Sequence, residues 1–477
     1  MAQDQAQADS EFLAPIDQMM HPYRQQFPAN SRIPRQGRSR DEILAELTEL
    51  RALEESRWKQ GYASGSVYHG DSSHIEYMNQ AYALHSQTNQ LHSDLWPSAA
   101  KFEAEIIAMT ATMLGADRTT APFGSEEGVC GSVSSGGSES ILLAMKAYRD
   151  WARDKRGITE PELVMPVSAH AAFHKAGQYF QIKIRTTPLD DGFRADLNAL
   201  EDAINENTIG IIGSAVNFPY GTIDPLEEMS EIALRRGVLM HVDGCLGGYF
   251  LPWAEKLGAP VPQFDFRLPG VTSMSCDTHK YGYAPKGTSV VLYRGMELRR
   301  YQFFTLADWP GGLYYSPTFS GSRPGGLSAA CWAALMTIGE QGYLDATKRI
   351  LDAVAIMKQG VESIPELRLL GKTVGVFAFT ADSLDTYQVL DQMSYRHWAL
   401  TGLQHPPAIH LSPTQRHTTP GVAERFVSDL RESVAFVRET PNIEGGMAPI
   451  YGLAASIPDK SIVHDLLKQV MDVYYRL

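Results

Sequence analysis

The segment SCDTHKYGYAPKG, residues 275–287, constrains this chain more than any other stretch of its sequence. It follows a short apolar run and places His279 directly before Lys280, with Gly282 close behind. The apolar run predicts a strand, so Lys280 is expected to lie partly buried beside the end of a sheet. Desolvation disfavours the charged form of a lysine, and we therefore expect Lys280 not to remain a plain cation. An imine to a carbonyl compound is one productive outcome for such an amine.

The stretch VLMHVDGCLGG, residues 238–248, supplies an acidic partner for Lys280. It is an apolar strand that ends in Asp243 and breaks on glycines. Pyridoxal phosphate (PLP) is held through a lysine, usually with an acidic residue at its pyridine nitrogen. A strand ending in Asp, followed by a strand ending in Ser-x-x-x-His-Lys, therefore predicts a PLP enzyme of the aminotransferase-like fold. The alternative is that Asp243 caps a helix and Lys280 is a solvated loop residue.

A glycine-rich turn in SSGGSESILLAMKAYRDW, residues 134–151, predicts a phosphate site. Ser138 is the expected N-cap of an amphipathic helix, and Gly137 lets the backbone approach a ligand closely. Capping alone is the commoner explanation of such a turn. The sequence contains neither GxGxxG nor GxxxxGK[ST], which excludes dinucleotide and P-loop interpretations. The position of this glycine-rich turn before the Asp and Lys motifs favours a binding site for the phosphate of PLP.

The histidines of SAHAAFHKAGQYF, residues 168–180, follow another expected strand end. The flat imidazole of His170 can stack on an aromatic cofactor there. His170 and His174 also have the spacing of a metal pair on a helix. No HExxH pattern and no nearby third ligand accompanies them, so we predict no metal site and assign His174 to an exposed helix face.

Composition limits the classes of partner and compartment. The net charge of −13 argues against a nucleic-acid partner, because phosphate backbones require a basic protein face. The four cysteines have no metal or CxxC spacing, which favours a reducing compartment. No apolar run approaches the ~18 residues that cross a bilayer, and residues 1–40 have no hydrophobic signal segment. The expected location is the cytoplasm, with residues 1–40 as a flexible arm or one that orders against a partner subunit.

Short apolar runs alternate with amphipathic segments along most of the chain. This alternation predicts a mostly parallel sheet covered by helices. Strands are expected near residues 163–167, 182–186, 209–216, 238–242, 271–275 and 288–293. Helices are expected near residues 40–59, 99–114, 138–153, 171–178, 197–205, 226–235 and 328–361. Residues 61–93 are expected to be a polar loop, and a smaller C-terminal α+β domain is expected to contain strands near 367–370 and 374–380.

Six motifs occur in an order that resembles the group II PLP-dependent decarboxylase superfamily. They are SSGGSES, SAHAAFHKA, NFPYGTIDP, HVDGCLGG, SCDTHKYGYAPKG and GGLYYSPTFSGSRPG. Within the superfamily they most resemble the sphingosine-1-phosphate lyase branch, clearly over roughly residues 60–380. The resemblance implies an α/β chain of PLP fold-type I (aspartate aminotransferase-like), with a mostly parallel seven-stranded sheet. We expect residues 1–98 to serve the dimer and active site, residues 99–345 to form the PLP-binding domain and residues 346–477 to form the small domain.

The resemblance also implies roles for individual residues. Lys280 would be the Schiff-base lysine, Asp243 would keep the pyridine nitrogen protonated, and His170 would stack on the ring. The implied phosphate ligands of PLP are Gly137, Ser138, His279 and, across a dimer interface, Ser322. The implied residues on the substrate side are Tyr68, Asn89, His92, Lys286 and Tyr314.

Three functions follow as hypotheses. The first is a PLP-dependent aldehyde lyase that cleaves the C2–C3 bond of sphingosine 1-phosphate or a similar phosphorylated long-chain base by retro-aldol chemistry. The catalytic base could be Tyr68, Tyr314, Lys280 or the cofactor phosphate. The second is an amino-acid α-decarboxylase, for which the sequence offers no evident carboxylate-binding arginine. The third is an inactive PLP-binding protein, against which the intact Lys, Asp and His set argues.

The lyase branch differs from this chain in one respect. Its eukaryotic members carry an amino-terminal membrane anchor, which is not found here. A soluble homodimer like the bacterial lyases is the expectation, acting on a phosphorylated lipid either in its own cell or after export into a host.

Overall fold

The structure is a computed structural model that describes residues 13–122, 125–440 and 460–477. The chain forms two compact units, one of Met1–Ser56 with Asn442–Leu477 and one of Arg57–Pro441. Within the described ranges, no helix has the length and apolar character needed to span a membrane.

The first unit contains most of α2 (Arg40–Lys59), whose predicted bounds are confirmed, and α15 (Lys460–Val473). None of the residues of α2 is buried within this chain. The expectation of a flexible N-terminal arm is wrong for residues 13–20, which are helical and place Leu13 and Ile16 in a small buried core with Val473. For residues 21–39, which are mostly turns and exposed coil, it stays a prediction. Residues 1–12 of the arm lie outside the described residues.

A seven-stranded sheet in the order β1-β7-β6-β5-β4-β2-β3 is the centre of the second unit, which confirms the predicted fold class. Strands β2 to β6 pair in parallel, whereas β7 is antiparallel to both β6 and β1. Six strands arise at the predicted apolar runs: β2 (Glu162–Pro166), β3 (Lys183–Thr187), β4 (Thr208–Ser214), β5 (Leu239–Asp243), β6 (Ser273–Cys276) and β7 (Ser289–Arg294). The seventh, β1 (Val129–Ser134), had no predicted counterpart, because its sequence VCGSVS is rich in serine and glycine.

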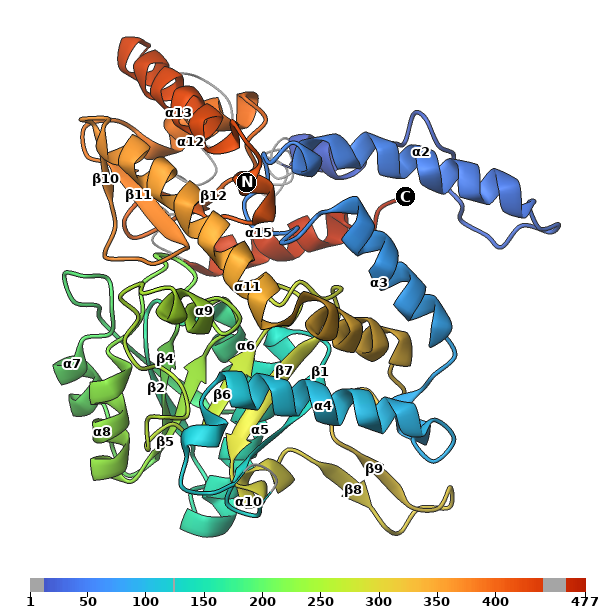
Figure 1. The fold of residues 1–477 in the computed structure, drawn as a ribbon, viewed down its shortest axis with the longest axis vertical. Helices are drawn as coiled ribbons and strands as arrows, with labels where there is room; N and C mark the ends of the chain where they lie inside the picture. The colour runs from blue at the N-terminus through green and yellow to red at the C-terminus, as the bar shows by residue number, and fades with distance from the viewer. Residues whose placement is uncertain (1–12, 123–124, 441–459) are drawn as a thin grey trace. The chain divides into compact units, whose positions relative to one another are not determined.

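Helices pack around this sheet, as Figure 1 shows for α4, α8 and α9. The apolar face of α5 (Gly137–Arg156) is buried, and its Tyr148 hydroxyl hydrogen-bonds the side chains of Thr272 and Ser273 at 2.6 and 2.7 Å. Burial of one apolar stripe per helix supplies the main favourable free energy of this layer. The other helices of the large layer are α4 (Pro97–Met113), α6 (Ala171–Phe180), α7 (Leu197–Asp202), α8 (Leu226–Arg236), α9 (Leu251–Lys256) and α10 (Met296–Arg300).

The long helix α11 (Gly325–Glu362) leads from the large sheet to the smaller α+β domain and is broken at Gly339, whose φ is 59°. The smaller sheet is antiparallel, in the order β10-β11-β13-β12. Its elements are β10 (Leu367–Leu369), β11 (Phe377–Ala381), α12 (Thr386–Tyr395), β12 (Thr401–Leu403), β13 (Ala408–Leu411) and α13 (Val422–Glu439). The domain limits at residues 98/99 and 345/346 fall inside α4 and α11 and remain a prediction.

The expectation of a continuous loop over residues 61–93 is wrong. Residues 72–84 form helix α3 (Ser72–Leu84), which packs against α11 and buries Met78. The side chain of Asp71 caps this helix by accepting the backbone N–H groups of Ser73 and His74. Its polar and aromatic composition concealed the helical period, although an N-cap of this type is a recognisable start signal.

Candidate active site

A cavity of about 390 Å³ lies at one edge of the large sheet. Strands β1, β2, β5 and β6 all run in the same direction, so their carboxyl ends meet at this edge. Open α/β sheets bind ligands at that position. Six predicted site residues line the cavity: Gly137, Ser138, His170, Asp243, His279 and Lys280. The structure therefore brings together the predicted cofactor residues other than Ser322.

Lys280 is held by Asp277, a residue for which the sequence predicted no role. The two side chains form an ion pair of 2.9 Å between Nζ and Oδ2. Desolvation is the largest single influence and lowers the pKa of Lys280, but Asp277, together with Cys245 and Tyr68, more than offsets it and raises the pKa above the ordinary value. The prediction that burial would discharge this lysine is therefore wrong for the chain alone. The i, i+3 spacing of Asp277 and Lys280 was the available signal.

Asp243 is the last residue of β5 and is buried. Its Oδ1 accepts hydrogen bonds from the Cys245 backbone N–H at 3.0 Å and the Ser275 hydroxyl at 3.1 Å. Desolvation would raise its pKa, but the nearby His170, the hydrogen bonds from Cys245 and the Lys280 ammonium prevail and hold the pKa below the ordinary value. A buried carboxylate that stays ionised suits a protonated ring nitrogen. It caps no helix, since the next one begins at Leu251.

The start of α5 differs by two residues from the prediction. Gly136 is the N-cap, so Ser138 lies inside the first turn. A Cβ on Gly137 would come within 2.7 Å of the Asp277 carboxylate and 2.8 Å of Cys245 Sγ, so only glycine fits. Gly136 and Ser138 could not be told apart as N-caps from their residue types, because both glycine and serine are good caps. Gly137, Ser138 and Glu139 of this first turn line the cavity, where the free N–H groups of a helix start suit an anion.

Two histidines complete the wall of the cavity. His170 is exposed and caps α6, with Nδ1 accepting the Ala172 N–H at 3.1 Å. His279 donates its Nδ1–H to the Thr288 carbonyl at 2.7 Å, which leaves Nε2 for a ligand. Burial lowers the pKa of His279. Among the described residues, His170 and His174 belong to no metal-binding group of three or more ligands.

Tyr68 and Lys286 lie in a groove of about 260 Å³ that shares His279 with the cavity. Tyr68 is buried, and desolvation raises its pKa. The Lys286 ammonium donates to the Ser66 carbonyl and lies 5.4 Å from the centroid of the Tyr68 ring. The apolar part of the groove consists of Val67, Ile75, Met78, Ala284 and Pro285.

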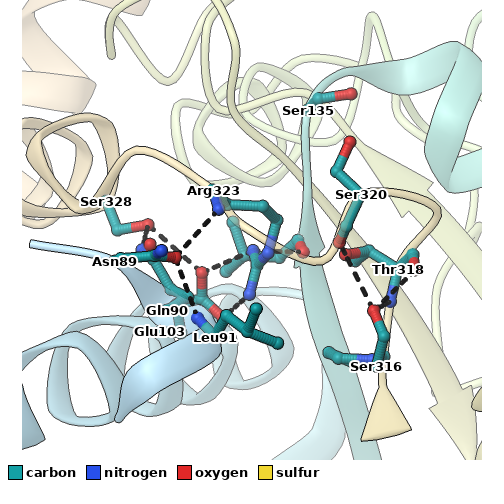
Figure 2. A network of polar contacts seen from close by, with 12 residues as sticks. Asn89, Gln90, Leu91, Glu103, Ser135, Ser316, Thr318, Ser320, Arg323 and Ser328 are labelled. Carbon is teal, nitrogen blue, oxygen red and sulfur yellow. Dashed lines mark hydrogen bonds and ion pairs between the residues drawn. The ribbon is translucent and has the colours of Figure 1, made fainter. Parts of the chain in front are cut away.

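Asn89 and Ser322 lie together but do not line the cavity of their own chain. Asn89 donates from Nδ2 to Ser322 Oγ at 3.0 Å, and its Oδ1 accepts the N–H groups of Leu91 and Arg323. Figure 2 shows Asn89 among Gln90, Glu103, Arg323 and Ser328, where it ties the short helix η1 (Gln90–His92) to the segment before α11. Both polar ends of Asn89 therefore have partners within the chain, and its role toward the substrate phosphate stays a prediction.

His92 and Tyr314 also lie outside the cavity and the groove. His92 is exposed at the end of η1, and its ring is 6.5 Å from that of Trp96. Tyr314 lies on β9 (Tyr314–Ser316), which pairs with β8 (Phe304–Leu306). Its hydroxyl lies against Gly321, where a Cβ would approach to 2.5 Å. Within one chain, four of the predicted residues are thus separate from the other eight.

The residues of the cavity fit PLP. Asp243 is an ionised partner for the ring nitrogen, Lys280 offers an amine, His170 offers a flat ring, and the first turn of α5 offers anion donors. The Oδ1 of Asp277 is buried and has no hydrogen-bond partner among the described residues, which marks a wall built to face a further polar group.

Comparisons with known proteins identify relatives of this chain. A family model described as the pyridoxal-dependent decarboxylase conserved domain matches residues 29–369. The sphingosine-1-phosphate lyase of Arabidopsis thaliana is 48% identical over 421 residues, covering 87% of this chain and 76% of the plant protein. The solved sphingosine-1-phosphate lyase of Burkholderia pseudomallei is 44% identical with a TM-score of 0.89, covering 96% of this chain and 99% of that one. The glutamate decarboxylase of Lactobacillus brevis shares the fold, with a TM-score of 0.73 at 19% identity over 88% of this chain and 98% of its own.

Proposed function

We propose that this chain, which belongs to the pyridoxal-dependent decarboxylase family and within it to the sphingosine-1-phosphate lyases, is a PLP-dependent aldehyde lyase. It cleaves the C2–C3 bond of sphingosine 1-phosphate or a similar phosphorylated long-chain base, giving a long-chain aldehyde and phosphoethanolamine. The observation that carries the proposal is the pairing of the Lys280 cavity with a groove that combines apolar walls and the Lys286 ammonium.

The cofactor, when bound, supplies an electron sink for the bond that breaks. The chain contributes the groups that hold and orient it. Asp243 stays ionised and so holds a proton at the ring nitrogen. The first turn of α5 and the Nε2 atom of His279 are placed for the cofactor phosphate, and His170 is placed for the face of the ring.

Proton transfer falls to residues between the cavity and the groove. Desolvation raises the pKa of Tyr68, so its hydroxyl remains protonated at neutral pH and can donate to an oxygen of the substrate. Lys280, which lines the cavity and interacts electrostatically with Tyr68, is the other candidate of this chain once the substrate amine has taken its place. Tyr314 lies elsewhere in the chain and could serve as a base only in the site of a second subunit.

The decarboxylase hypothesis needs a group that recognises a carboxylate. No arginine occurs among the described residues that line the cavity or the groove. The likeness to a solved glutamate decarboxylase, at 19% identity, supports only the shared fold. An inactive PLP-binding protein is disfavoured because Lys280, Asp243 and His170 occur together in one cavity.

Replacing Lys286 by Ala tests the substrate assignment. We expect kcat/KM for the phosphorylated base to fall at least about tenfold, since one charge-assisted hydrogen bond of about 1.5 kcal/mol corresponds to that factor. His92→Ala should behave in the same way. The colour and cofactor content of both variants should match the wild type, and Lys175→Ala on the exposed face of α6 is the matched control. Steady-state assays with phosphorylated and unphosphorylated base measure the effect.

Two outcomes would contradict the lyase assignment. One is normal cleavage of the phosphorylated base by Lys286→Ala. The other is release of CO₂ by the wild type from glutamate, tyrosine or tryptophan at a comparable rate.

We also propose that the active form is a homodimer in a reducing, cytoplasmic compartment. All four cysteines are buried and unpaired, which supports the compartment. Asn89, His92, Tyr314 and Ser322 are separate from the cavity of their own chain, which supports a role in the site of a partner. The strands β8 and β9 and the turn between them expose large apolar side chains that suit an interface: Phe304, Trp309, Leu313 and Tyr315.

Mixing the inactive Lys280→Ala variant with the impaired His92→Ala variant tests this arrangement. In a heterodimer of Lys280→Ala with His92→Ala, one of the two sites would contain both intact residues. Random exchange should therefore restore about a quarter of wild-type activity, because half of the dimers are mixed and each has one good site. Sedimentation measures whether the active protein is a dimer. A fully active monomer, or a mixture no more active than its components, would contradict the proposal.

A further inference from the structure

Asp277 lies on the turn between β6 and Lys280, and its side chain is only 2% exposed. The backbone N–H of Lys280 donates to the Asp277 carbonyl at 3.3 Å, which closes a tight turn. This turn brings the two side chains to the same side, where Nζ and Oδ2 are 2.9 Å apart. Asp277 therefore orients the Lys280 ammonium from within the same backbone turn.

The opposite side of the Asp277 carboxylate faces the start of α5. The Cβ position of Gly137 is 2.7 Å from Oδ2 and 2.8 Å from Oδ1, so the carboxylate lies directly against that first turn. The positive end of a helix dipole favours an anion there. Oδ1 has no hydrogen-bond partner among the described residues, so the carboxylate depends for its stabilisation mainly on Lys280 and on this helix end, with His279 Nε2 further off at 3.9 Å from Oδ2.

We infer that Asp277 is the positioning residue of Lys280: its carboxylate holds Nζ at the cavity wall and sets when that nitrogen carries a proton. The inference rests on the proposed function, in which Lys280 is the lysine that carries the cofactor. Asp277 acts through Lys280 and need not touch the substrate.

The charged groups around Lys280 indicate how the loss of Asp277 would change the pKa of Lys280. Desolvation lowers the pKa of Lys280, whereas Asp277 is the largest influence that raises it. The other titratable groups that interact electrostatically with the lysine are Asp243, Cys245, Cys276, Tyr68, His279 and Lys286. Without the Asp277 charge, desolvation prevails, and the pKa of the Lys280 nitrogen should fall below its wild-type value.

The first measurement uses the wild-type protein freed of cofactor. Only a neutral amine reacts with an acylating reagent, so the labelling rate of Lys280, followed by peptide mass spectrometry across pH, reports its pKa. We expect a value above that of an ordinary exposed lysine. A lower value would overturn the inference without any variant.

The second measurement uses the protein loaded with PLP. The Lys280 amine joins the aldehyde of PLP with loss of water, and the protonated form of this linkage absorbs visible light. In Asp277→Asn we expect the pH at which the visible band disappears to fall by about one unit or more, because an adjacent anion no longer stabilises the proton. Asp277→Glu should restore the wild-type profile, since it returns the charge.

The matched control is Asp224→Asn, which changes another buried acid of the same unit that is remote from the cavity lining. It should leave the band unchanged. If the visible band of Asp277→Asn disappears at the same pH as that of the control, Asp277 is only structural and the inference fails. If Lys280→Ala retains the visible band, Lys280 is not the cofactor lysine and the proposed function fails instead. Should Asp277→Asn not fold, the labelling profile of the wild type still decides.

Discussion

We expect the purified protein to be yellow, and we expect Lys280→Ala to lose both the colour and, by about 10³-fold or more, the turnover. Lys280 offers its amine to the cavity that also contains Asp243 and His170. Without that amine the chain can hold the cofactor only through non-covalent contacts. Absorbance spectra and steady-state assays measure the two losses.

Lys280→Arg is the appropriate companion variant. Lys280→Ala removes the partner of the buried Asp277 and so lowers stability as well as activity, because an unpaired buried charge is costly. Arginine keeps a cation next to Asp277 but has no amine that can join an aldehyde. It should therefore retain the melting temperature and still lose colour and turnover. Borohydride reduction of the wild type should fix a pyridoxyl group on Lys280, and its discovery on Lys286 would overturn the assignment.

The cofactor part of the site could be predicted because it depends on short-range sequence. Asp243 ends β5, and Lys280 follows the end of β6 on a short turn. Parallel strands place such ends at one edge of the sheet. The order of the Asp243 and Lys280 motifs along the chain was therefore enough to predict that these residues meet there. The elements that were missed lack a periodic apolar pattern: β1 is rich in small residues, and α3 is polar on most of its surface.

The protonation of Lys280 could not be predicted in the same way. Burial is visible in an apolar pattern, but the carboxylate that counters it is identified only when the turn after β6 is folded. Asn89 illustrates a second limit. Its contact with Ser322 joins positions 233 residues apart, and this pairing follows from the packing of α3, α4 and α11 rather than from a local motif. Residues expected to act in a second subunit are beyond the reach of any pattern within one chain.

The second large effect is expected at Asp243. We expect Asp243→Asn to bind PLP on Lys280 and yet to lower kcat by about 10²–10⁴-fold, the range for losing one proton-holding group. The amide oxygen can still accept the hydrogen bonds from the Cys245 N–H and the Ser275 hydroxyl, so the local structure should persist. Only the negative charge disappears. A neutral side chain cannot hold a proton at the ring nitrogen by charge, and the electron sink weakens accordingly.

Ser275→Ala separates charge from geometry at the same carboxylate. It removes the 3.1 Å hydrogen bond to Asp243 Oδ1 but leaves the anion and the Cys245 donor in place. Because His170 also holds the pKa of Asp243 below the ordinary value, the carboxylate should stay ionised and kcat should fall less than about tenfold. Cofactor content, measured after borohydride reduction, should be equal in the wild type and both variants. If Asp243→Asn loses no more activity than Ser275→Ala, the charge of Asp243 is not what drives the bond cleavage, and its assignment to the ring nitrogen is wrong.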